Sequence, residues 1–244
     1  MSRLTIAVVP IYGRPKLTRW CLGKLKTLPG IDYVIAVGST PGDREVAEEV
    51  GVEYYPYENT PTKLGQKWQH GVEIALQQGA DGIMFCGSDD VWQLNTVSRL
   101  WEAIDNGAVM VGSAAWYLVM LKTGDVYLQR YRTRDDSIGT GRLFSAQFIR
   151  EKLNGFLLGK ELLKDKSIDG YITRRIAAAG GKQIAVEGIE PALCKLNVGK
   201  GEGQITAASA LLSSKNIISE EVYITFANDL LFEWSMYART MEVE

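Results

Sequence analysis

The chain has 244 residues, of which 46% are hydrophobic, and this is enough to bury a core as one domain or as two small ones. Its formal net charge is -2, so no overall attraction to nucleic acid or to a membrane surface is expected. The three cysteines lack the spacing of a zinc site and predict reduced, buried thiols. The N-terminus lacks the apolar segment of a signal peptide, and no run approaches the ~18 apolar residues of a membrane span, so we expect a cytoplasmic protein.

Strand and helix patterns alternate through the first half of the chain. An apolar run rich in branched residues predicts a strand over 4–10, and a helical spacing of apolar residues follows it over 17–25. The same succession recurs, which makes four strand–helix units and favours a parallel or mostly parallel sheet. The further predicted strands cover 33–37, 52–55 and 82–89, and the further helices cover 43–50 and a longer segment opened by Pro61.

The second half has a different pattern. Two apolar-rich runs, 116–121 and 126–130, flank a turn that contains Gly124 and predict a β-hairpin. We therefore predict one α/β domain, with a mostly parallel sheet flanked by helices and a small antiparallel insertion. The other predicted elements are a strand over 109–111, a loop over 132–141, helices over 143–153 and 168–179, a loop over 197–203 and terminal helices after it.

Two adjacent carboxylates end the buried strand that starts at Gly82. Ligands of an open α/β sheet bind at the carboxyl ends of the strands, so Asp89 and Asp90 lie where a substrate would bind. Two neighbouring acids repel each other unless a cation or strong donors offset the repulsion. The simplest cation is Mg²⁺ or Mn²⁺, which takes oxygen ligands and shares them with a substrate phosphate. The structural alternative is that one of the two acids caps a helix beginning near Gln93.

Four motifs follow one another at the ends of predicted elements. They are Pro10-Ile11-Tyr12-Gly13-Arg14-Pro15, Gly38-Ser39-Thr40, Gly87-Ser88-Asp89-Asp90, and the segment 167–180, in which Asp169 precedes a helix. Their order and spacing resemble those of a family 2 glycosyltransferase of the GT-A fold, over most of residues 4–180. The compact chain also resembles virus-encoded members of this fold, which would place it in the host cytoplasm.

The resemblance implies a division of the chain and a reaction. It implies a Rossmann-like half over 1–107 that binds a nucleotide sugar, an acceptor-side half over 108–200, and C-terminal helices over 201–244. The implied reaction moves a sugar from a nucleotide-diphosphate donor to a hydroxyl, with inversion if a base acts in a single displacement. Asp169 would be that base, and its structural alternative is a helix N-cap, in competition with Ser167.

Residues near the four motifs are candidates for binding roles in that reaction. Mn²⁺ or Mg²⁺ held by Asp89 and Asp90 would stabilise the diphosphate as it leaves. Tyr12 would stack on a nucleobase, Arg14 and the lysines would contact phosphate, and Trp92 would form a wall for the acceptor. The structural alternatives are ordinary packing for the aromatic rings, a surface arginine and solvated lysines. The donor-side candidates are Pro10, Tyr12, Arg14, Gly38, Ser39, Lys63, Lys67 and Ser88, and those for the acceptor or the diphosphate loop are Trp92, Lys195 and Lys200.

Three positions depart from the family pattern. Ala36 and Val37 stand where family members carry an acid that holds the base or ribose of the nucleotide, and Gly87 replaces the first acid of the metal motif. We therefore expect this chain either to recognise its nucleotide differently from the family or to use a donor other than a common UDP sugar.

The predicted acceptor is a glycan or, as for the virus-encoded proteins, a modified nucleobase in DNA. The stretch 127–134 interleaves arginine with tyrosine as a DNA-binding patch would, but an exposed strand edge is the favoured interpretation, and the acidic charge balance speaks against DNA. Two other classes are kept as alternatives. A nucleotidyltransferase should carry a Gly-rich basic loop after the first strand, where this chain has only Gly13. A catalytically silent nucleotide-binding module would explain the lost acids as a decayed site.

Overall fold

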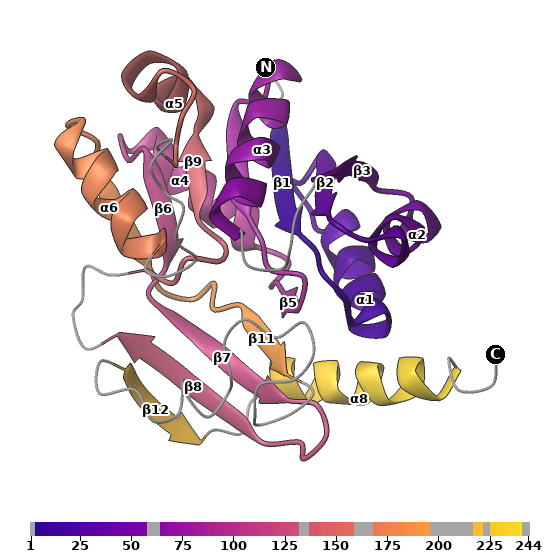
Figure 1. Cartoon of the computed structure of the whole chain (residues 1–244). Helices are drawn as coiled ribbons and strands as arrows, with labels where there is room; N and C mark the ends of the chain where they lie inside the picture. The colour runs from indigo at the N-terminus through magenta and orange to yellow at the C-terminus, as the bar shows by residue number, and fades with distance from the viewer. Residues whose placement is uncertain are drawn as a thin grey trace.

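The computed structural model describes residues 3–57, 64–131, 137–158, 168–195, 217–221 and 225–240. A seven-stranded sheet flanked by helices lies above a five-stranded sheet in the view of Figure 1. The chain is an α/β protein, as the alternating strand and helix patterns predicted. Within the described ranges, no helix is long and apolar enough to cross a membrane.

The seven-stranded sheet has the strand order β10-β6-β9-β4-β1-β2-β3. All neighbouring strands are parallel except for β9, which runs antiparallel to β4 and β6. The sheet is therefore mostly parallel, as predicted. In chain order, the strands are β1 (Thr5–Pro10), β2 (Tyr33–Gly38), β3 (Glu53–Pro56), β4 (Gly82–Phe85), β6 (Met110–Ser113), β9 (Leu143–Ser145) and β10 (Gln183–Val186).

Helices cover both faces of this sheet because successive residues of a buried strand point to opposite sides. On β1, Ile6 and Val8 belong to one core, whereas Ala7 and Val9 belong to the other. The first core contains side chains of α3 (Leu64–Gln77), α5 (Ala146–Leu153) and α6 (Ile168–Ala178). The second contains side chains of α1 (Pro15–Lys26), α2 (Pro41–Val50) and α4 (Thr96–Asp105).

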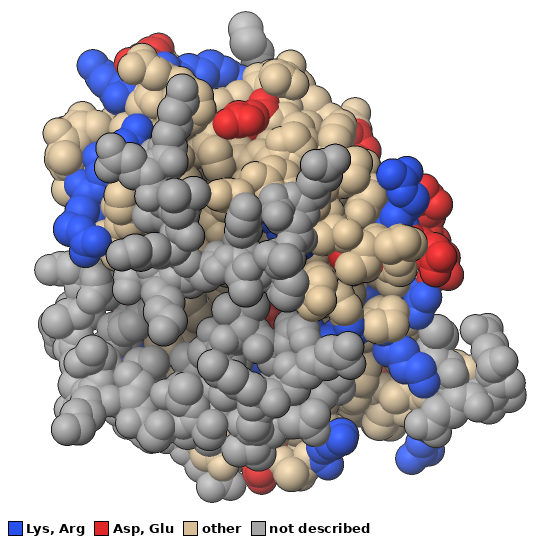
Figure 2. All heavy atoms as spheres, viewed as in Figure 1, with Lys and Arg blue, Asp and Glu red and all other residues tan. Residues whose placement is uncertain are grey.

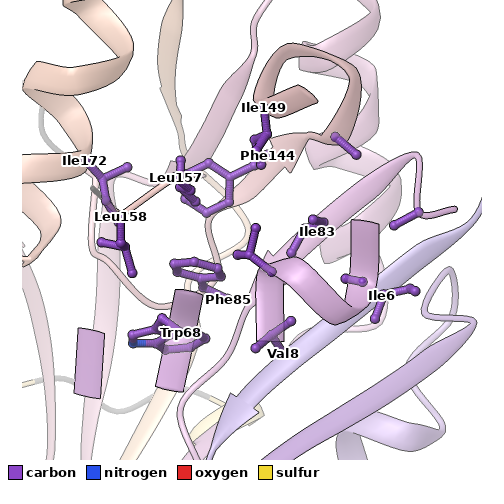
Figure 3. Close-up of a cluster of buried hydrophobic side chains, with 14 of the residues drawn as sticks. Ile6, Val8, Trp68, Ile83, Phe85, Phe144, Ile149, Leu157, Leu158 and Ile172 are labelled. Atoms are coloured by element: carbon purple, nitrogen blue, oxygen red, sulfur yellow. The ribbon is translucent and has the colours of Figure 1, made fainter. Parts of the chain in front are cut away.

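An aromatic cluster lies inside the first core (Figure 3). Trp68 of α3 stacks on Phe85 at the end of β4, with the ring centroids 4.1 Å apart, and Phe144 of β9 lies 4.8 Å from Phe85. All three side chains are buried. The cluster therefore holds α3 and β9 against the strand that leads to the carboxylate pair.

The five-stranded sheet has the order β12-β8-β7-β11-β5. Its β7 (Ala115–Met120) and β8 (Val126–Tyr131) form the predicted antiparallel hairpin. The remaining elements of this layer are β5 (Asp90–Val91), β11 (Ala192–Lys195), β12 (Ile217–Glu221) and α8 (Thr225–Thr240), which packs against β7 and α1. Because β5 follows β4 closely in the chain, the two sheets meet at the carboxylate pair.

Three expectations about elements are wrong. The helix predicted over 143–153 begins only at Ala146, because the residues before it form β9 between β4 and β6. Residues 217–221 form a strand within the predicted C-terminal helices. The stretch from Tyr127 is no exposed strand edge, since β7 and β12 pair with β8 on its two sides.

Candidate functional site

The ends of β1, β2 and β4 meet at one edge of the seven-stranded sheet. These strands are neighbours and run parallel, so the segments that follow them leave the sheet side by side. Arg14, Ser39 and Asp89 lie in those three segments. Ligands of open α/β sheets bind at this kind of edge, and the predicted motifs gather there.

Asp89 is held between two cations. Its Oδ2 accepts a hydrogen bond from Arg14 Nη1 at 2.9 Å and forms an ion pair with Lys195 Nζ. Arg14 also donates from Nη2 to Ser88 Oγ at 3.1 Å. Burial by itself would raise the pKa of Asp89, but the two cations outweigh burial and hold this pKa well below its usual range. Asp89 is therefore ionised at neutral pH.

The local backbone brings both cations to Asp89. Arg14 has a left-handed conformation, with φ 52° and ψ 52°, immediately before α1 begins. Lys195 arrives through the pairing of β11 with β5, which includes a bond from Cys194 N to Asp89 O at 2.7 Å. The side chains of Arg14 and Lys195 are only 10% and 8% exposed. The alternatives of a surface arginine and a solvated lysine are therefore wrong at these positions.

Asp90 has a different environment from its neighbour. Its Oδ2 accepts hydrogen bonds from Gly87 N at 2.8 Å and from Thr140 Oγ1. Burial, reinforced by the negative charge of Asp89, raises the pKa of Asp90 to about 6. Neither acid caps a helix, because α4 begins only at Thr96, and this structural alternative is wrong.

The glycine at position 87 is required by this arrangement. A Cβ atom on Gly87 would overlap the carboxyl group of Asp90. An acid at position 87 is therefore incompatible with the bonds of Asp90 to Gly87 N and Thr140. The glycine at position 87 thus leaves room for the buried carboxyl group of Asp90.

A segment that leads into β9, residues 137–142, lies between the carboxylate pair and Asp169. A Cβ atom on Gly139 would overlap the carboxyl group of Asp169, and the next residue, Thr140, donates to Asp90. Asp169 and Asp90 therefore contact two consecutive residues, whose Cα atoms are about 3.8 Å apart. The structure thus brings the predicted base close to the predicted metal ligands.

The same segment contacts Trp92 and the start of α6. Gly141 has φ 76°, and a Cβ atom there would overlap the indole ring of Trp92. Arg142 is buried and donates from Nη1 to Asp169 O at 3.0 Å and from Nη2 to Ser137 O at 2.7 Å. Arg142 therefore fixes the first turn of α6, in which Asp169 lies.

A further buried carboxylate, Asp43, joins the loops after β1 and β2. Its oxygens accept hydrogen bonds from Gly13 N at 3.0 Å, Ser39 N at 2.9 Å and Thr40 N at 3.0 Å. Asp43 and Thr40 also form a capping box at the N-terminus of α2. The sequence analysis missed Asp43, although the Thr-x-x-Asp spacing of a capping box was its signal.

Lys67 lies buried beside these loops. Its Nζ donates to Ile11 O at 2.9 Å and lies 5.6 Å from the ring centroid of Tyr12. Burial lowers the pKa of Lys67, against the effect of the negative charge of Asp43. The side chain is not solvated, and within the described residues only one of its three N–H donors has a partner. The remaining donors are suited to an incoming anionic or carbonyl oxygen.

The end of β2 offers no acid to a nucleotide. Ala36 and Val37 are fully buried and belong to the two cores of the seven-stranded sheet. A Cβ atom on Gly38 would clash with Asp43 and Tyr54. Backbone groups are therefore what this strand end can present to a ligand.

Most of the predicted site residues lie along this edge. The cluster around Asp89 contains Arg14, Ser88, Asp90 and Lys195, and the 137–142 segment adjoins Trp92 and Asp169. Pro10, Tyr12, Gly38, Ser39 and Lys67 lie at or near the ends of β1 and β2. Lys63 and Lys200 lie outside the described residues. Residues that the sequence analysis missed are Asp43, Gly139, Thr140 and Arg142. The signal for the 137–142 segment was its sequence Gly139-Thr140-Gly141, in which a hydroxyl residue lies between two glycines.

The carboxylate pair fits a divalent cation that is shared with a substrate. Across the described ranges, no group of three or more His, Cys, Asp or Glu side chains gathers as a complete metal site. In the same part of the chain, Oδ1 of Asp89 and Oδ1 of Asp90 accept no hydrogen bond, whereas both Oδ2 atoms do. Mg²⁺ is commonly bound by one or two carboxylates together with substrate phosphates and water, and this pair offers such a donor set.

Comparison with known proteins shows the fold and no family. Neither a family model nor a curated protein matches the sequence. Among solved structures, a 4-diphosphocytidyl-2C-methyl-D-erythritol synthase superposes with a TM-score of 0.53 at 16% identity, over 77% of this chain and 90% of that one. Residues 1–349 of S. aureus TarS, in complex with UDP-GlcNAc, superpose with a TM-score of 0.57 at 12% identity, over 83% of this chain and 61% of that one. The likeness confirms the predicted GT-A-like α/β fold.

Proposed function

We propose that this chain is a glycosyltransferase that moves a sugar from a nucleotide-diphosphate donor to an acceptor hydroxyl. The observation that carries the proposal is the position of Asp169, whose carboxyl group lies against Gly139 while Thr140 binds Asp90. A sugar transferase needs a base for the acceptor and a charged site for the leaving diphosphate close to each other. The proposal extends to membership of glycosyltransferase family 2 and to a virus-encoded origin.

The cations around Asp89 support binding of the diphosphate. Negative charge builds on the diphosphate as its bond to the sugar C1 breaks, and buried donors stabilise that charge far better than solvated ones do. Arg14 and Lys195 bring two positive charges to the single negative charge of Asp89. Mn²⁺ or Mg²⁺ bound by Asp89 and Asp90 would add Lewis-acid stabilisation of the same charge.

Asp169 would act as the general base. It would accept the proton of the acceptor hydroxyl while the hydroxyl oxygen attacks C1 from the face opposite the diphosphate, which inverts the configuration. General-base assistance of this kind contributes a factor of about 10²–10⁴ to the rate. Arg142, through its bond to Asp169 O, and Gly139, through its close packing, would hold the base in position.

The ends of β1 and β2 would hold the nucleotide. Tyr12 offers its ring to the base. Two N–H donors of Lys67 have no partner among the described residues and are available to a phosphate or a base carbonyl. The backbone at Gly38 and Ser39 would replace the acid found in related enzymes. The UDP-GlcNAc bound to TarS makes a uridine-diphosphate sugar the first donor to test. Lys63 and Lys200 stay candidates for phosphate binding.

A glycan is the proposed acceptor. Trp92 is buried in the second core, so ordinary packing accounts for its ring and the predicted acceptor wall is not part of the proposal. A modified nucleobase in DNA is the second acceptor to test. Figure 2 shows the described Lys and Arg side chains of this face along its left edge and on its right side, where acidic side chains lie among them. A polyanion such as DNA is normally bound by clustered basic residues, and the net charge of -2 favours the glycan.

A nucleotidyltransferase is the second candidate function. The observation in its favour is the likeness to a synthase of a diphosphocytidyl compound, which covers 90% of that protein. Against it, the loop between β1 and α1 contains a single glycine, Gly13, and a single basic residue, Arg14, and is not the Gly-rich basic loop expected of that class. A silent nucleotide-binding module is the third candidate.

The deciding experiment measures product release from nucleotide sugars in the presence of Mn²⁺ and an oligosaccharide acceptor. We expect release of nucleoside diphosphate, and we expect Asp169→Asn to lower kcat by about 10²–10⁴ without loss of folding. Release of pyrophosphate from a nucleoside triphosphate would instead identify the nucleotidyltransferase. Tight nucleotide binding without turnover would identify the silent module, and an Asp169→Asn variant as fast as the wild type would remove Asp169 as the base.

A further inference from the structure

The C-terminal helix α8 has one packed face and one exposed face. It lies along α1 and the five-stranded sheet, where Leu230 is buried and Trp234 packs against Trp20 with the ring centroids 5.3 Å apart. Lys24 of α1 forms an ion pair with Glu233. Figure 1 shows α8 running along the lower right of the molecule, and these contacts fix its orientation.

Four residues form a stripe along the exposed face of α8. They are Asp229, Phe232, Met236 and Arg239, and all four are exposed. Phe232 is 68% exposed and Met236 is 48% exposed, which makes them two of the four large hydrophobic side chains that stand out from the described surface. At about 100° of rotation per residue, the four positions lie within about 80° of one another. An apolar pair thus lies between an acid at one end and a base at the other.

This stripe is complementary to itself when it is turned around. In an antiparallel pair of α8 helices centred on Trp234, Asp229 of each copy lies level with Arg239 of the other, and Phe232 lies level with Met236. A two-fold interface requires such a pattern, because when one residue contacts a second residue of the other copy, the same contact is repeated with the two copies exchanged. We propose that the stripe is the contact between two copies of this chain, which associate as an antiparallel α8–α8 dimer.

The pattern of charge selects a second copy over other partners. The acid and the base each find an opposite charge in the same register that covers Phe232, whereas a partner of one charge sign would leave one end of the stripe repelled. A contact made by one helix is smaller than the ~1,200 Å² that stable interfaces bury, so the dimer should be in equilibrium with the monomer. The dimer goes beyond the proposed transferase activity, and its contact uses none of the residues assigned to that activity.

Sedimentation velocity across a range of concentrations tests the proposal. We expect the wild type to shift from monomer to dimer as its concentration rises, and Phe232→Glu to remove the shift. Leu94→Glu is the matched control, because Leu94 is 75% exposed but lies far from α8 in the chain, and it should leave the association unchanged. A wild type that stays monomeric throughout would overturn the proposal, as would association that Phe232→Glu leaves intact.

Exchange of the two charges tests the antiparallel register. Asp229→Arg alone puts two arginines level across the axis, and Arg239→Asp alone puts two aspartates there, so each variant should weaken association at least about tenfold. An equal mixture of these two variants should associate again, because every level then pairs an arginine with an aspartate. Equal thermal stability of the variants confirms folding. A mixture that associates no better than its components would overturn the register and the proposal with it.

Discussion

At the scale of single residues, Asp89 and Asp90 are neighbours in the chain but have different surroundings. Two cations lower the pKa of Asp89 despite burial, whereas burial and the charge of Asp89 raise the pKa of Asp90 to about 6. Pairs of titratable groups whose pKa values are pushed apart are typical of functional sites. The contrast predicts opposite effects of the same substitution at the two positions.

Asp90→Asn should stabilise the fold at neutral and higher pH. The folded protein binds the proton of Asp90 more tightly than the unfolded chain does. The contribution of this proton to the free energy of unfolding is therefore complete below about pH 4 and is lost as the pH rises through about 6. The amide stays uncharged, and we expect the free energy of unfolding to increase by about 1–3 kcal/mol at pH 8. Urea unfolding at pH 5 and pH 8 checks this, and a gain that is equal at both pH values would contradict it.

Asp89→Asn should destabilise the fold. Because the pKa of Asp89 is lowered in the folded protein, its contribution to the free energy of unfolding is present at pH values above the ordinary carboxyl pKa. That contribution is lost only as the pH falls below the ordinary carboxyl pKa. The substitution leaves Arg14 and Lys195 buried without their carboxylate, which costs about 3 kcal/mol. The same urea series measures the loss, and a variant as stable as the wild type would show that the ion pairs contribute little.

Gly139→Ala should slow the proposed transfer without unfolding the protein. The added methyl group would displace the carboxyl group of Asp169, and a shift of about 1 Å in a catalytic group can cost about 10²-fold in rate. Gly42→Ala is the control, since its Cβ would meet open space. Turnover and thermal stability of both variants check the prediction, which is wrong if the two variants react equally fast.

At the scale of elements, two glycines inside helices allow the cost of overpacking the core to be compared with the gain in helix propensity. A Cβ on Gly71 of α3 would overlap Val8 of β1, whereas a Cβ on Gly23 of α1 would meet nothing. Alanine gains about 1 kcal/mol over glycine inside a helix, but overpacking a core costs about 1–3 kcal/mol. Gly23→Ala should therefore stabilise the protein and Gly71→Ala destabilise it, as chemical denaturation would show. Stabilisation by both would mean that α3 moves away from the sheet freely.

The elements also show what could be predicted from the sequence. The first four strands and their helices have clear apolar periods, so their existence and parallel order were predictable. β9 was missed because its three residues continue without a break into the apolar pattern of α5. The pairing of β11 with β5 brings Lys195 to Asp89 from far along the chain, and no local pattern indicates such a contact. The motif Ser88-Asp89-Asp90, in contrast, was recognisable because its residues are consecutive.

At the scale of the whole molecule, the site depends on the meeting of two sheets. β4 brings the carboxylate pair to the edge of the seven-stranded sheet, and the five-stranded sheet supplies β5 and β11, with Lys195 at the end of β11. The 137–142 segment leads into β9 of the upper sheet and contacts Asp90 and Asp169 on the way. Both sheets therefore have to fold before the proposed site is complete.

The most direct test of the account is a thermal-shift measurement with UDP, UDP-GlcNAc and other nucleotide diphosphates, each with and without Mn²⁺. A ligand at about 100 times its dissociation constant adds about 2.7 kcal/mol of stability. We predict stabilisation by at least one nucleotide diphosphate, strengthened by Mn²⁺ in the wild type and no longer strengthened by it in Asp89→Asn. Absence of any shift across the panel, or a shift that Asp89→Asn leaves unchanged, would contradict a nucleotide-diphosphate site at this edge of the sheet.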